Sequence, residues 1–363
     1  MLKKAGWVTA IAAAGISLSS AAVADMWRFA LEEVEGSVQH VYAQEFKKRI
    51  EKRSDGDITI EIYPYGSLGT SPQLTALIKQ DAIQLAFASA GHLGSVIPEV
   101  GVFTLHFLLS DDNKINEQVL ATTEARPLLQ EAYHEQDLQL LGIIPEGWMV
   151  WTANRAIESP TDMEGFKVRT MTSPILEESY RAYGADPEPL PYAEVYSNLR
   201  SGQIEGQVNP IFAIEEMKFY EVQDYLIQAK PAQFITTLIA AQGFYENLPN
   251  VQKTMIDDVT DEMRRYIFDK QEELNQQRLE TIKENGDIEM ITLSEEQRQA
   301  FREKSLPVRD AYIEQAGERG EKILEILDRE LRAEEKEKGG SAKEDDSAKE
   351  DDSADEDDSV GED

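Results

Sequence analysis

The sequence predicts an α/β protein made of two lobes with a ligand cleft between them, followed by long C-terminal helices. Strand and helix signals alternate through the first 240 residues, which favours parallel strands covered by helices. The stretch 25–332 is long for a single hydrophobic core, so two lobes are the expected arrangement. Ligands in such folds bind at the carboxyl ends of strands and between domains.

The first elements follow from hydrophobic periodicity. A strand is expected at Trp27–Leu31, and Val38–Ile50 has apolar residues at helical spacing. Alternation predicts a strand at Ile58–Tyr63, and Pro64–Gly69 is a turn. The elements expected next are a helix at Pro72–Ala82 with Ser71 as its N-cap, a strand at Ile83–Ala88, a helical stretch from Asp112 to His134, and strands at Leu138–Ile144 and Trp148–Ala153.

The second half continues the alternation and then becomes helical. The expected elements are a turn at Asp162, a strand at Phe166–Thr170, a helix, a strand at Glu188–Leu190, a helix at Ala193–Arg200, and strands at Ile204–Val208 and Phe234–Ala241. From there to about Arg332 we expect helices. The predicted lobe I is 25–148 plus about 235–277, and lobe II is 149–234 plus about 278–333.

The two ends of the chain differ from the rest. Residues 1–24 are typical of an export signal, with two lysines, an apolar stretch and the small residues Ala22-Val23-Ala24 before Asp25. Residues 334–363 are predicted to be a disordered acidic tail, because the repeated Ser-Ala-Lys-Glu-Asp-Asp unit cannot bury apolar surface. The signal predicts a periplasmic protein, and we expect a monomer.

The composition excludes several classes of function. The net charge is -33, and about -25 remains once the +2 of residues 1–24 and the -10 of residues 341–363 are set aside. Such a charge repels nucleic acid, and it suits a protein that works in high salt. The chain has no cysteine, which excludes disulfides, thiolate metal sites and a lipid-modified Cys anchor.

Signatures of catalysis are missing. The sequence contains no phosphate-binding, dinucleotide-binding, zinc-protease or nucleophile-elbow motif. The four histidines, His40, His92, His106 and His134, have no metal-ligand spacing. We therefore expect no enzymatic activity, no metal and no cofactor.

Two motifs resemble those of solute-binding proteins of TRAP transporters, the C4-dicarboxylate-binding family. One is Ser159-Pro160-Thr161-Asp162-Met163-Glu164-Gly165-Phe166-Lys167-Val168-Arg169, and the other is the stretch from Pro191 to Asn209. Glu205 and Val208 depart from the second motif, where the family usually has Asp and Glu. The resemblance covers about 25–332 and implies a periplasmic binding protein fold. It also implies that membrane permease subunits are the partners.

Within that family, the sequence is most similar in appearance to members that bind ectoine and hydroxyectoine. The stretches Pro145-Glu146-Gly147, Arg169-Thr170-Met171-Thr172 and Asn209-Pro210-Ile211-Phe212 carry this similarity. The resemblance implies that Arg169 holds the ligand carboxylate, a role for which its planar guanidinium is suited. Asn209 could add a hydrogen bond, although an Asn before Pro210 could equally form a turn.

The resemblance also implies that Glu33 meets the cationic part of the ligand. Together, Arg169 and Glu33 predict a zwitterion rather than a plain dicarboxylate. Met149 stands where sugar-acid-binding relatives have a second Arg, which disfavours a sialic-acid-type site.

Aromatic walls are the weak point of the ectoine interpretation. Phe234 and Phe212 match the subgroup and Tyr192 could replace a Trp, but Ala213 and His92 stand where further aromatic residues are expected. Trp148, Trp151 or Phe87 could refill the space, and His92 could donate to a ligand hydroxyl. The alternatives left open are a small amine such as ethanolamine, a hydroxy acid or sugar acid, and an enzyme or sensor partner with the same fold.

Overall fold

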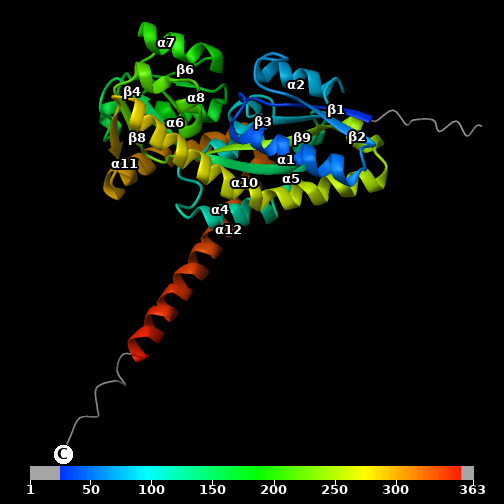
Figure 1. The fold of residues 1–363 in the computed structure, drawn as a ribbon. Helices are drawn as coiled ribbons and strands as arrows, with labels where there is room; N and C mark the ends of the chain where they lie inside the picture. Colours follow the sequence, from blue (N-terminus) through cyan, green and yellow to red (C-terminus); the bar gives the residue numbers. More distant parts are fainter. Residues whose placement is uncertain (1–24, 353–363) are drawn as a thin grey trace, which may run out of the picture.

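The computed structural model describes the backbone of residues 25–352 and the side chains of residues 25–338. The predicted signal at 1–24 and residues 353–363 of the predicted tail lie outside the described residues. Strands and helices form two lobes side by side, with several long elements running through both (Figure 1).

Lobe I contains three strands and the helices around them. Its elements are β1 (Asp25–Ala30), α1 (Val38–Arg53), β2 (Ile58–Tyr63), α2 (Ser71–Lys79), β3 (Leu85–Ser89), α3 (Ala90–Leu93), the 3-10 helix η1 (Pro98–Thr104), α4 (Asn113–Thr122) and α5 (Arg126–His134). Ser71 is the first residue of α2 and not its N-cap as predicted. Thr70 takes the N-cap position, where its backbone N–H donates to Gln73 Oε1 at 2.8 Å.

Lobe II contains five strands. Its elements are η2 (Pro160–Met163), β5 (Lys167–Thr170), α6 (Pro174–Ala182), β6 (Asp186–Pro189), η3 (Tyr192–Glu194), α7 (Val195–Ser201), β7 (Gly206–Pro210), α8 (Ile211–Glu216), η4 (Phe219–Val222), β8 (Tyr225–Gln228), β10 (Glu289–Thr292) and α11 (Glu295–Ser305). The short strands β8 and β10 were not predicted. Each is four residues long and pairs with the other in parallel, so neighbours in space, rather than local alternation, define them.

Four elements link the lobes: β4 (Leu138–Ala153), β9 (Gln233–Ala241), α10 (Asn250–Asn285) and α12 (Val308–Asp352). Helix α10 packs on α1 in lobe I and on α8 in lobe II, and it crosses beneath both in Figure 1. Between β9 and α10 lies the short helix α9 (Gln242–Asn247). None of the helices within the described residues is both long enough and apolar enough to cross a bilayer.

The sheet order is β2-β1-β3-β9-β4-β7-β5-β6. The outer pairs are parallel, as the alternation of strands and helices predicted. The two linking strands instead run antiparallel to each other and to their neighbours β3 and β7. The sheet is therefore mixed, because β4 and β9 pass from one lobe to the other in opposite directions.

Strand β4 is continuous, although the sequence predicted two strands separated at Pro145–Gly147. Its register with β9 shifts between Pro145 and Trp148, which is a β-bulge rather than a turn. Residues 138–148 pair with β9, and residues 149–153 pair with β7 and β8. The bulge therefore marks the crossing point between the lobes.

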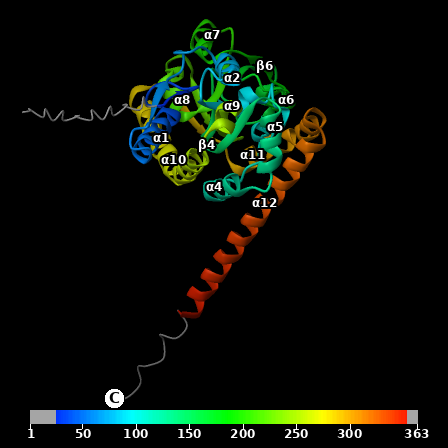
Figure 2. The same cartoon turned by 90° about the vertical axis from the view of Figure 1, so that its right-hand side faces the viewer.

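The C-terminal helix packs on lobe I. The buried side chains of α12, from Val308 to Leu331, belong to the same apolar cluster as those of η1, α4 and α5. Helix α12 also contacts α6 of lobe II, so it joins the two lobes, and the assignment of 278–333 to lobe II stays a prediction. Beyond the body the helix projects outward to Asp352 (Figures 1 and 2). Over 334–352 the backbone is thus helical rather than extended, consistent with the high helix propensity of Ala, Glu and Lys.

Candidate functional site

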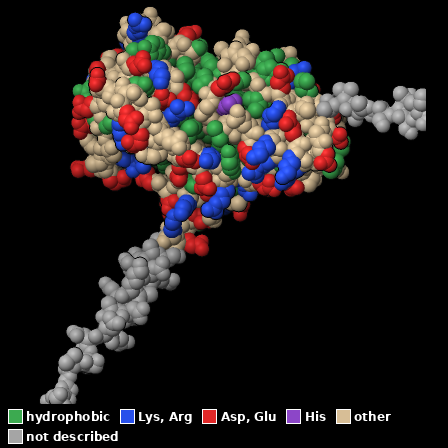
Figure 3. All heavy atoms as spheres, in the orientation of Figure 1, with side chains coloured by type: hydrophobic (Ala, Val, Ile, Leu, Met, Phe, Trp, Pro, Cys, Tyr) green, Lys and Arg blue, Asp and Glu red, His purple; other side chains and the backbone are tan. Residues whose placement is uncertain are grey.

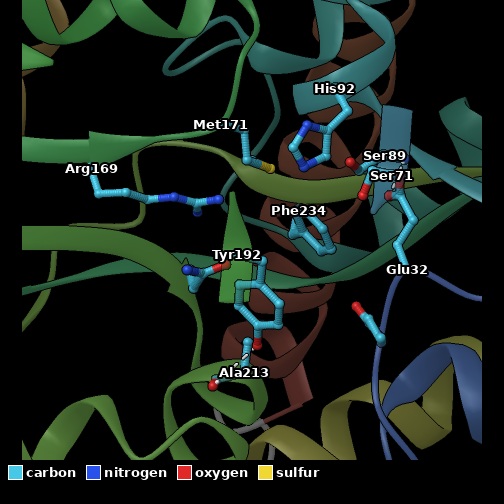
Figure 4. A pocket seen from close by; sticks show the side chains of 11 residues that line it. Glu32, Ser71, Ser89, His92, Arg169, Met171, Tyr192, Ala213 and Phe234 are labelled. Atoms are coloured by element: carbon cyan, nitrogen blue, oxygen red, sulfur yellow. Dashed lines mark hydrogen bonds between the residues drawn. The ribbon is translucent and has the colours of Figure 1, made fainter. Parts of the chain in front are cut away.

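A cavity lies between the lobes, where β1 and β3 of lobe I and β5 and β7 of lobe II end. These four strands direct their carboxyl ends toward a common region, as expected for a ligand site in an α/β protein. The free volume of this cavity is about 30 Å³, so the two lobes leave little empty space between them in this structure. It is lined by Glu32, Glu33, Ser71, Ser89, His92, Arg169, Met171, Tyr192, Asn209, Ala213 and Phe234 (Figure 4).

Arg169 brings a buried positive charge to the lobe II side of the cavity. Its side chain comes from β5 and is 1% exposed. Nε and Nη2 both donate to the carbonyl oxygen of Leu190, at 3.0 and 2.8 Å, and Nη1 has no partner among the described residues. Burial lowers the pKa of Arg169 to about 10, and no carboxylate is among the groups that oppose this shift. An unpaired buried guanidinium is costly, so this site is prepared for an anionic group.

Glu33 brings a buried carboxyl group to the lobe I side. It lies in the loop after β1 and is 5% exposed. Its Oε2 accepts a hydrogen bond at 3.2 Å from the backbone N–H of Gln39, a residue at the start of α1. Its Oε1 has no partner among the described residues. Burial and the neighbouring Glu146 hold the pKa of Glu33 well above its usual value. A ligand cation would stabilise the ionised form of this group.

The wall near β3 is polar. The Glu32 carboxylate accepts from the backbone N–H of Ser89 at 2.7 Å, while Ser89 Oγ is buried without a partner among the described residues. His92 Nδ1 lies 3.2 Å from Thr172 Oγ1, which belongs to lobe II. Burial, with a contribution from Arg169, lowers the pKa of His92 to about 3, so its imidazole is neutral. Figure 4 shows His92, Ser89, Ser71 and Glu32 together on one side of the cavity.

The remaining walls combine aromatic and amide groups. The Tyr192 hydroxyl donates to the carbonyl oxygen of Ala213 at 3.4 Å, which fixes its ring beside the cavity. Phe234 comes from β9 and lies between Tyr192 and His92 in Figure 4. The Asn209 amide donates to Gln207 Oε1, so its side chain belongs to a buried polar chain along β7 and does not form a turn.

The structure brings together six of the eight predicted site residues and places two elsewhere. Arg169, Glu33, Asn209, Tyr192, Phe234 and His92 line the cavity. Phe212 is fully buried in the apolar cluster of lobe I. Trp148 lines a different hollow, where Lys230 Nζ lies 5.9 Å from its ring centroid. Trp148 sits in the β4 bulge and faces away from Met149, as successive strand residues do.

The predicted replacement of missing aromatic walls by Trp148, Trp151 or Phe87 is not seen. Trp151 and Phe87 are core residues of lobe II and lobe I, respectively. Ala213 and His92 do line the cavity, and Met171 fills space beside them. An added Cβ at Gly91 would lie 2.4 Å from the terminal carbon of Met171, so this glycine makes room for the methionine.

Four lining residues were not predicted as site residues: Glu32, Ser71, Ser89 and Met171. Three of them stand at or just after strand ends, at β1, β3 and β5. The rule that ligands bind at the carboxyl ends of strands could therefore have identified them without any motif. Among the side chains that the structure describes, no group of three or more His, Asp or Glu residues is arranged to hold a metal ion.

Comparison with known proteins gives a family match over most of the chain. Residues 29–315 match the model of bacterial extracellular solute-binding protein, family 7 (DctP). The ectoine-binding periplasmic protein TeaA of Halomonas elongata is 38% identical over 91% of this chain and 97% of its own length. The ectoine/5-hydroxyectoine-binding periplasmic protein UehA of Ruegeria pomeroyi is 36% identical over 89% of this chain and 96% of its own length.

Solved structures agree with this match. The structure of TeaA superposes with a TM-score of 0.82 at 37% identity, covering 85% of this chain and all of that one. An apo open structure of a TRAP periplasmic solute-binding protein from Marinobacter aquaeolei gives a TM-score of 0.80 at 45% identity, covering 83% of this chain and 99% of that one.

Proposed function

Because this chain belongs to the family of bacterial extracellular solute-binding proteins, family 7, and is a TRAP-type solute-binding protein, we propose that it captures an ectoine-type zwitterion between its lobes. The observation that carries the proposal is the pair of opposite charges in one cavity. Within the part of the chain that the structure describes, Arg169 Nη1 on one side and Glu33 Oε1 on the other have no hydrogen-bond partner. A ligand with both a carboxylate and an amidinium complements both groups.

The roles proposed for the other lining residues follow from their chemistry. Tyr192 and Phe234 cover the apolar ring of the ligand and present π faces to its delocalised cation. Asn209 adds a neutral hydrogen bond, and His92 faces the ligand from lobe I. No covalent step is needed, and the similarity to transport proteins supports a role without catalysis.

The transport cycle that we propose is a clamp. Ligand enters the open cleft, Arg169 fixes its carboxylate, and the lobes close by bending near the bulge of β4. The closed protein then delivers the ligand to membrane permease subunits. The export-signal pattern of residues 1–24 and the periplasmic relatives support a periplasmic location. The acidity of the chain supports the proposal that the protein functions in an environment of high salt concentration.

A hydroxy acid or sugar acid is the second candidate ligand. It is favoured by the polar wall, where Ser89 Oγ is buried without a partner among the described residues and lies near a neutral His92. A simple amine such as ethanolamine is disfavoured, since it would leave the Arg169 guanidinium uncompensated.

The first prediction tests the ligand and Arg169 together. Isothermal titration calorimetry with ectoine, 5-hydroxyectoine, ethanolamine, succinate and galacturonate should show binding of the two ectoines. Arg169→Met should weaken ectoine binding at least about 100-fold, because two charge-assisted hydrogen bonds of about 1.5–3 kcal/mol each are lost.

Arg155→Met is the matched control. Arg155 is also in lobe II, but it pairs with Glu205 at 2.6 Å and does not line the cavity. Its substitution should leave the affinity unchanged. Binding of succinate or galacturonate in place of ectoine would reject a zwitterion as the ligand. Equal affinity of wild type and Arg169→Met for ectoine would reject the role of Arg169.

A further inference from the structure

A second buried carboxyl group lies behind Glu33 and has no part in the proposed capture of the ligand. Glu146 sits in the β4 bulge between Pro145 and Trp148, and it is 0% exposed. It does not line the cavity, whereas Glu33 does. The carboxyl groups of Glu33 and Glu146 are buried neighbours, and each shifts the pKa of the other. The bulge between the lobes is thus joined directly to the ligand cavity.

The hydrogen bonds of these two neighbours leave one oxygen of each carboxyl group without a donor. Glu33 Oε2 accepts from the Gln39 N–H, and Glu146 Oε1 accepts from the Thr236 hydroxyl. The other oxygen of each group, Glu33 Oε1 and Glu146 Oε2, has no donor among the described residues. Ionised carboxylates only accept hydrogen bonds, so two of them can bond to each other only when one carries a proton.

No cationic side chain is among the main influences of the described residues on this pair. From lobe I, Glu32 adds a further acid near Glu146, and Glu216 of α8 faces Glu33 from lobe II. Arg278 of α10 bonds Glu215 at 3.1 Å and lies 3.7 Å from Glu216, so its charge is used there.

Other groups near the pair do not change this balance. Lys218 bonds Glu215, and the Tyr192 hydroxyl between Glu33 and Arg169 is neutral because burial raises its pKa. Burial likewise raises the pKa of Glu146 to about 7 and that of Glu33 well above its usual value. The two carboxyl groups therefore titrate as a coupled pair, at pH values above those of ordinary glutamates.

We infer that Glu33 and Glu146 share a proton in the empty cavity, and that the cationic group of the ligand displaces this proton on binding. Glu146 is therefore a positioning residue that acts through Glu33 and makes the capture of cation-bearing ligands release a proton. This inference rests on the proposed zwitterionic ligand. It adds a basis for specificity, because an anion without a cationic group cannot displace the proton.

The sign of the pH dependence follows from linkage. Ectoine keeps both charges near neutral pH, so any proton released comes from the protein. Below the apparent pKa of the pair, each ligand bound should release close to one proton. Its affinity should then rise by up to about tenfold per pH unit and level off above that pKa. A ligand that carries only a carboxylate should show no such rise.

The experiment counts protons. Ectoine is titrated calorimetrically at pH 6.5 in buffers of different ionisation enthalpy, and its affinity is measured from pH 5.5 to 8.5. Wild type should release between half and one proton per ectoine. Glu146→Gln keeps the shape and can donate an N–H to Glu33, so release should fall toward zero and the affinity profile should flatten.

Glu99→Gln is the control for a buried acid elsewhere in lobe I. Glu99 is 6% exposed and is bonded to Arg319 at 2.7 Å, far from the cavity lining. It should release as many protons as wild type. Binding of ectoine without proton release, or release that is unchanged in Glu146→Gln, would overturn the inference and leave the proposed function standing.

A measurement without ligand distinguishes a failure of the proposed ligand from a failure of the shared proton. Carboxyl carbon NMR of the ligand-free protein should show two glutamates that titrate together near neutral pH, and Glu146→Gln should remove this behaviour. If ectoine does not bind, the proposed ligand fails. The shared proton is then decided by this titration alone, and two ordinary, independent glutamates would overturn it.

Discussion

Single side chains in the cavity are held in unusual states by burial. Arg169 keeps a guanidinium nitrogen without a partner among the described residues, and His92 is neutral with a pKa of about 3. Outside the cavity, His106 is 4% exposed, and its Nδ1 lies 2.7 Å from the Tyr183 hydroxyl. Burial lowers its pKa to about 3 as well. Both imidazoles therefore stay unprotonated in the folded protein at pH values where an unfolded chain binds protons.

His106 should make the protein sensitive to acid. Its pKa is about 3 when folded and near 6.5 when unfolded, so the unfolded chain binds more protons between these values. The free energy of unfolding should fall as the pH drops below about 6.5, by up to about 1.4 kcal/mol per pH unit from this group. Urea unfolding of His106→Gln at pH 6.5, 5.5 and 4.5 should show a shallower loss than wild type.

His134→Gln is the control, because His134 is exposed and its Nε2 lies 2.9 Å from Gln139 Oε1. This variant should follow the wild-type curve. A loss of stability with the same slope in all three proteins would show that His106 does not contribute.

The sequence identified the charged residues of the site better than its walls. Arg169 ends a motif that is local in the sequence, and Glu33 follows the first strand at a position where the family resemblance implies an acid. Trp148 and Phe212 were assigned to the cavity, but the direction of a side chain near a bulge or at the start of a short helix depends on packing. Ser89 has no distinctive local pattern and Met171 was noted only as part of a motif, so only the convergence of strand ends identifies both as lining residues.

At the scale of elements, β4 shows how one local irregularity shapes the fold. Pro145 and Gly147 are typical of turns, so the sequence predicted a break in the strand. In the structure the strand continues because β9 pairs along both sides of the bulge. Gly147 has a φ of +128°, a conformation that side chains disfavour. A Cβ at this position would lie 2.5 Å from Asn275 Nδ2, which donates to the Glu146 carbonyl.

Gly147→Ala should destabilise the protein by roughly 1–3 kcal/mol, through backbone strain and displacement of the Asn275 amide. Thermal unfolding should show a lower melting temperature. Gly101→Ala is the control, since a Cβ there meets its neighbours at 3.4 Å or more, ordinary contact distances. Equal melting temperatures for the two variants would contradict the requirement for glycine in the bulge.

For the molecule as a whole, the main feature of the surface is its acidity. Acidic side chains are spread over the face seen in Figure 3, with basic ones among them, and many form ion pairs at the surface. Such pairs contribute little individually, so the net charge of -33 acts mainly on solubility. The suitability of this surface for high salt stays a prediction.

Contacts across the cavity hold the two lobes close together in this structure. The Tyr65 hydroxyl, in the turn after β2, accepts a hydrogen bond from the backbone N–H of Ala193 at 3.2 Å. The rings of Tyr65 and Tyr192 meet edge to face, with centroids 5.6 Å apart. On the other side of the cavity, His92 contacts Thr172. Tyr65 does not line the cavity, so it can affect ligand binding only through closure.

Tyr65→Ala should therefore weaken ligand binding without removing a ligand contact. It loses one hydrogen bond and one aromatic pair, together about 1–3 kcal/mol of the closed state, so the dissociation constant should rise about 10-fold or more. Tyr65→Phe keeps the ring and should lose less. Small-angle scattering of the liganded proteins should show a larger radius of gyration for Tyr65→Ala at subsaturating ligand.

Tyr63→Ala provides the control for this test. Tyr63 ends β2 two residues earlier, and its hydroxyl donates to Glu61 of the same lobe I strand. Its affinity should equal that of wild type. Closure contributes to affinity only if Tyr65→Ala is weaker than Tyr63→Ala, with Tyr65→Phe between them. If all three bind alike, the free energy of capture comes from the cavity itself, and the contacts at its rim merely accompany closure.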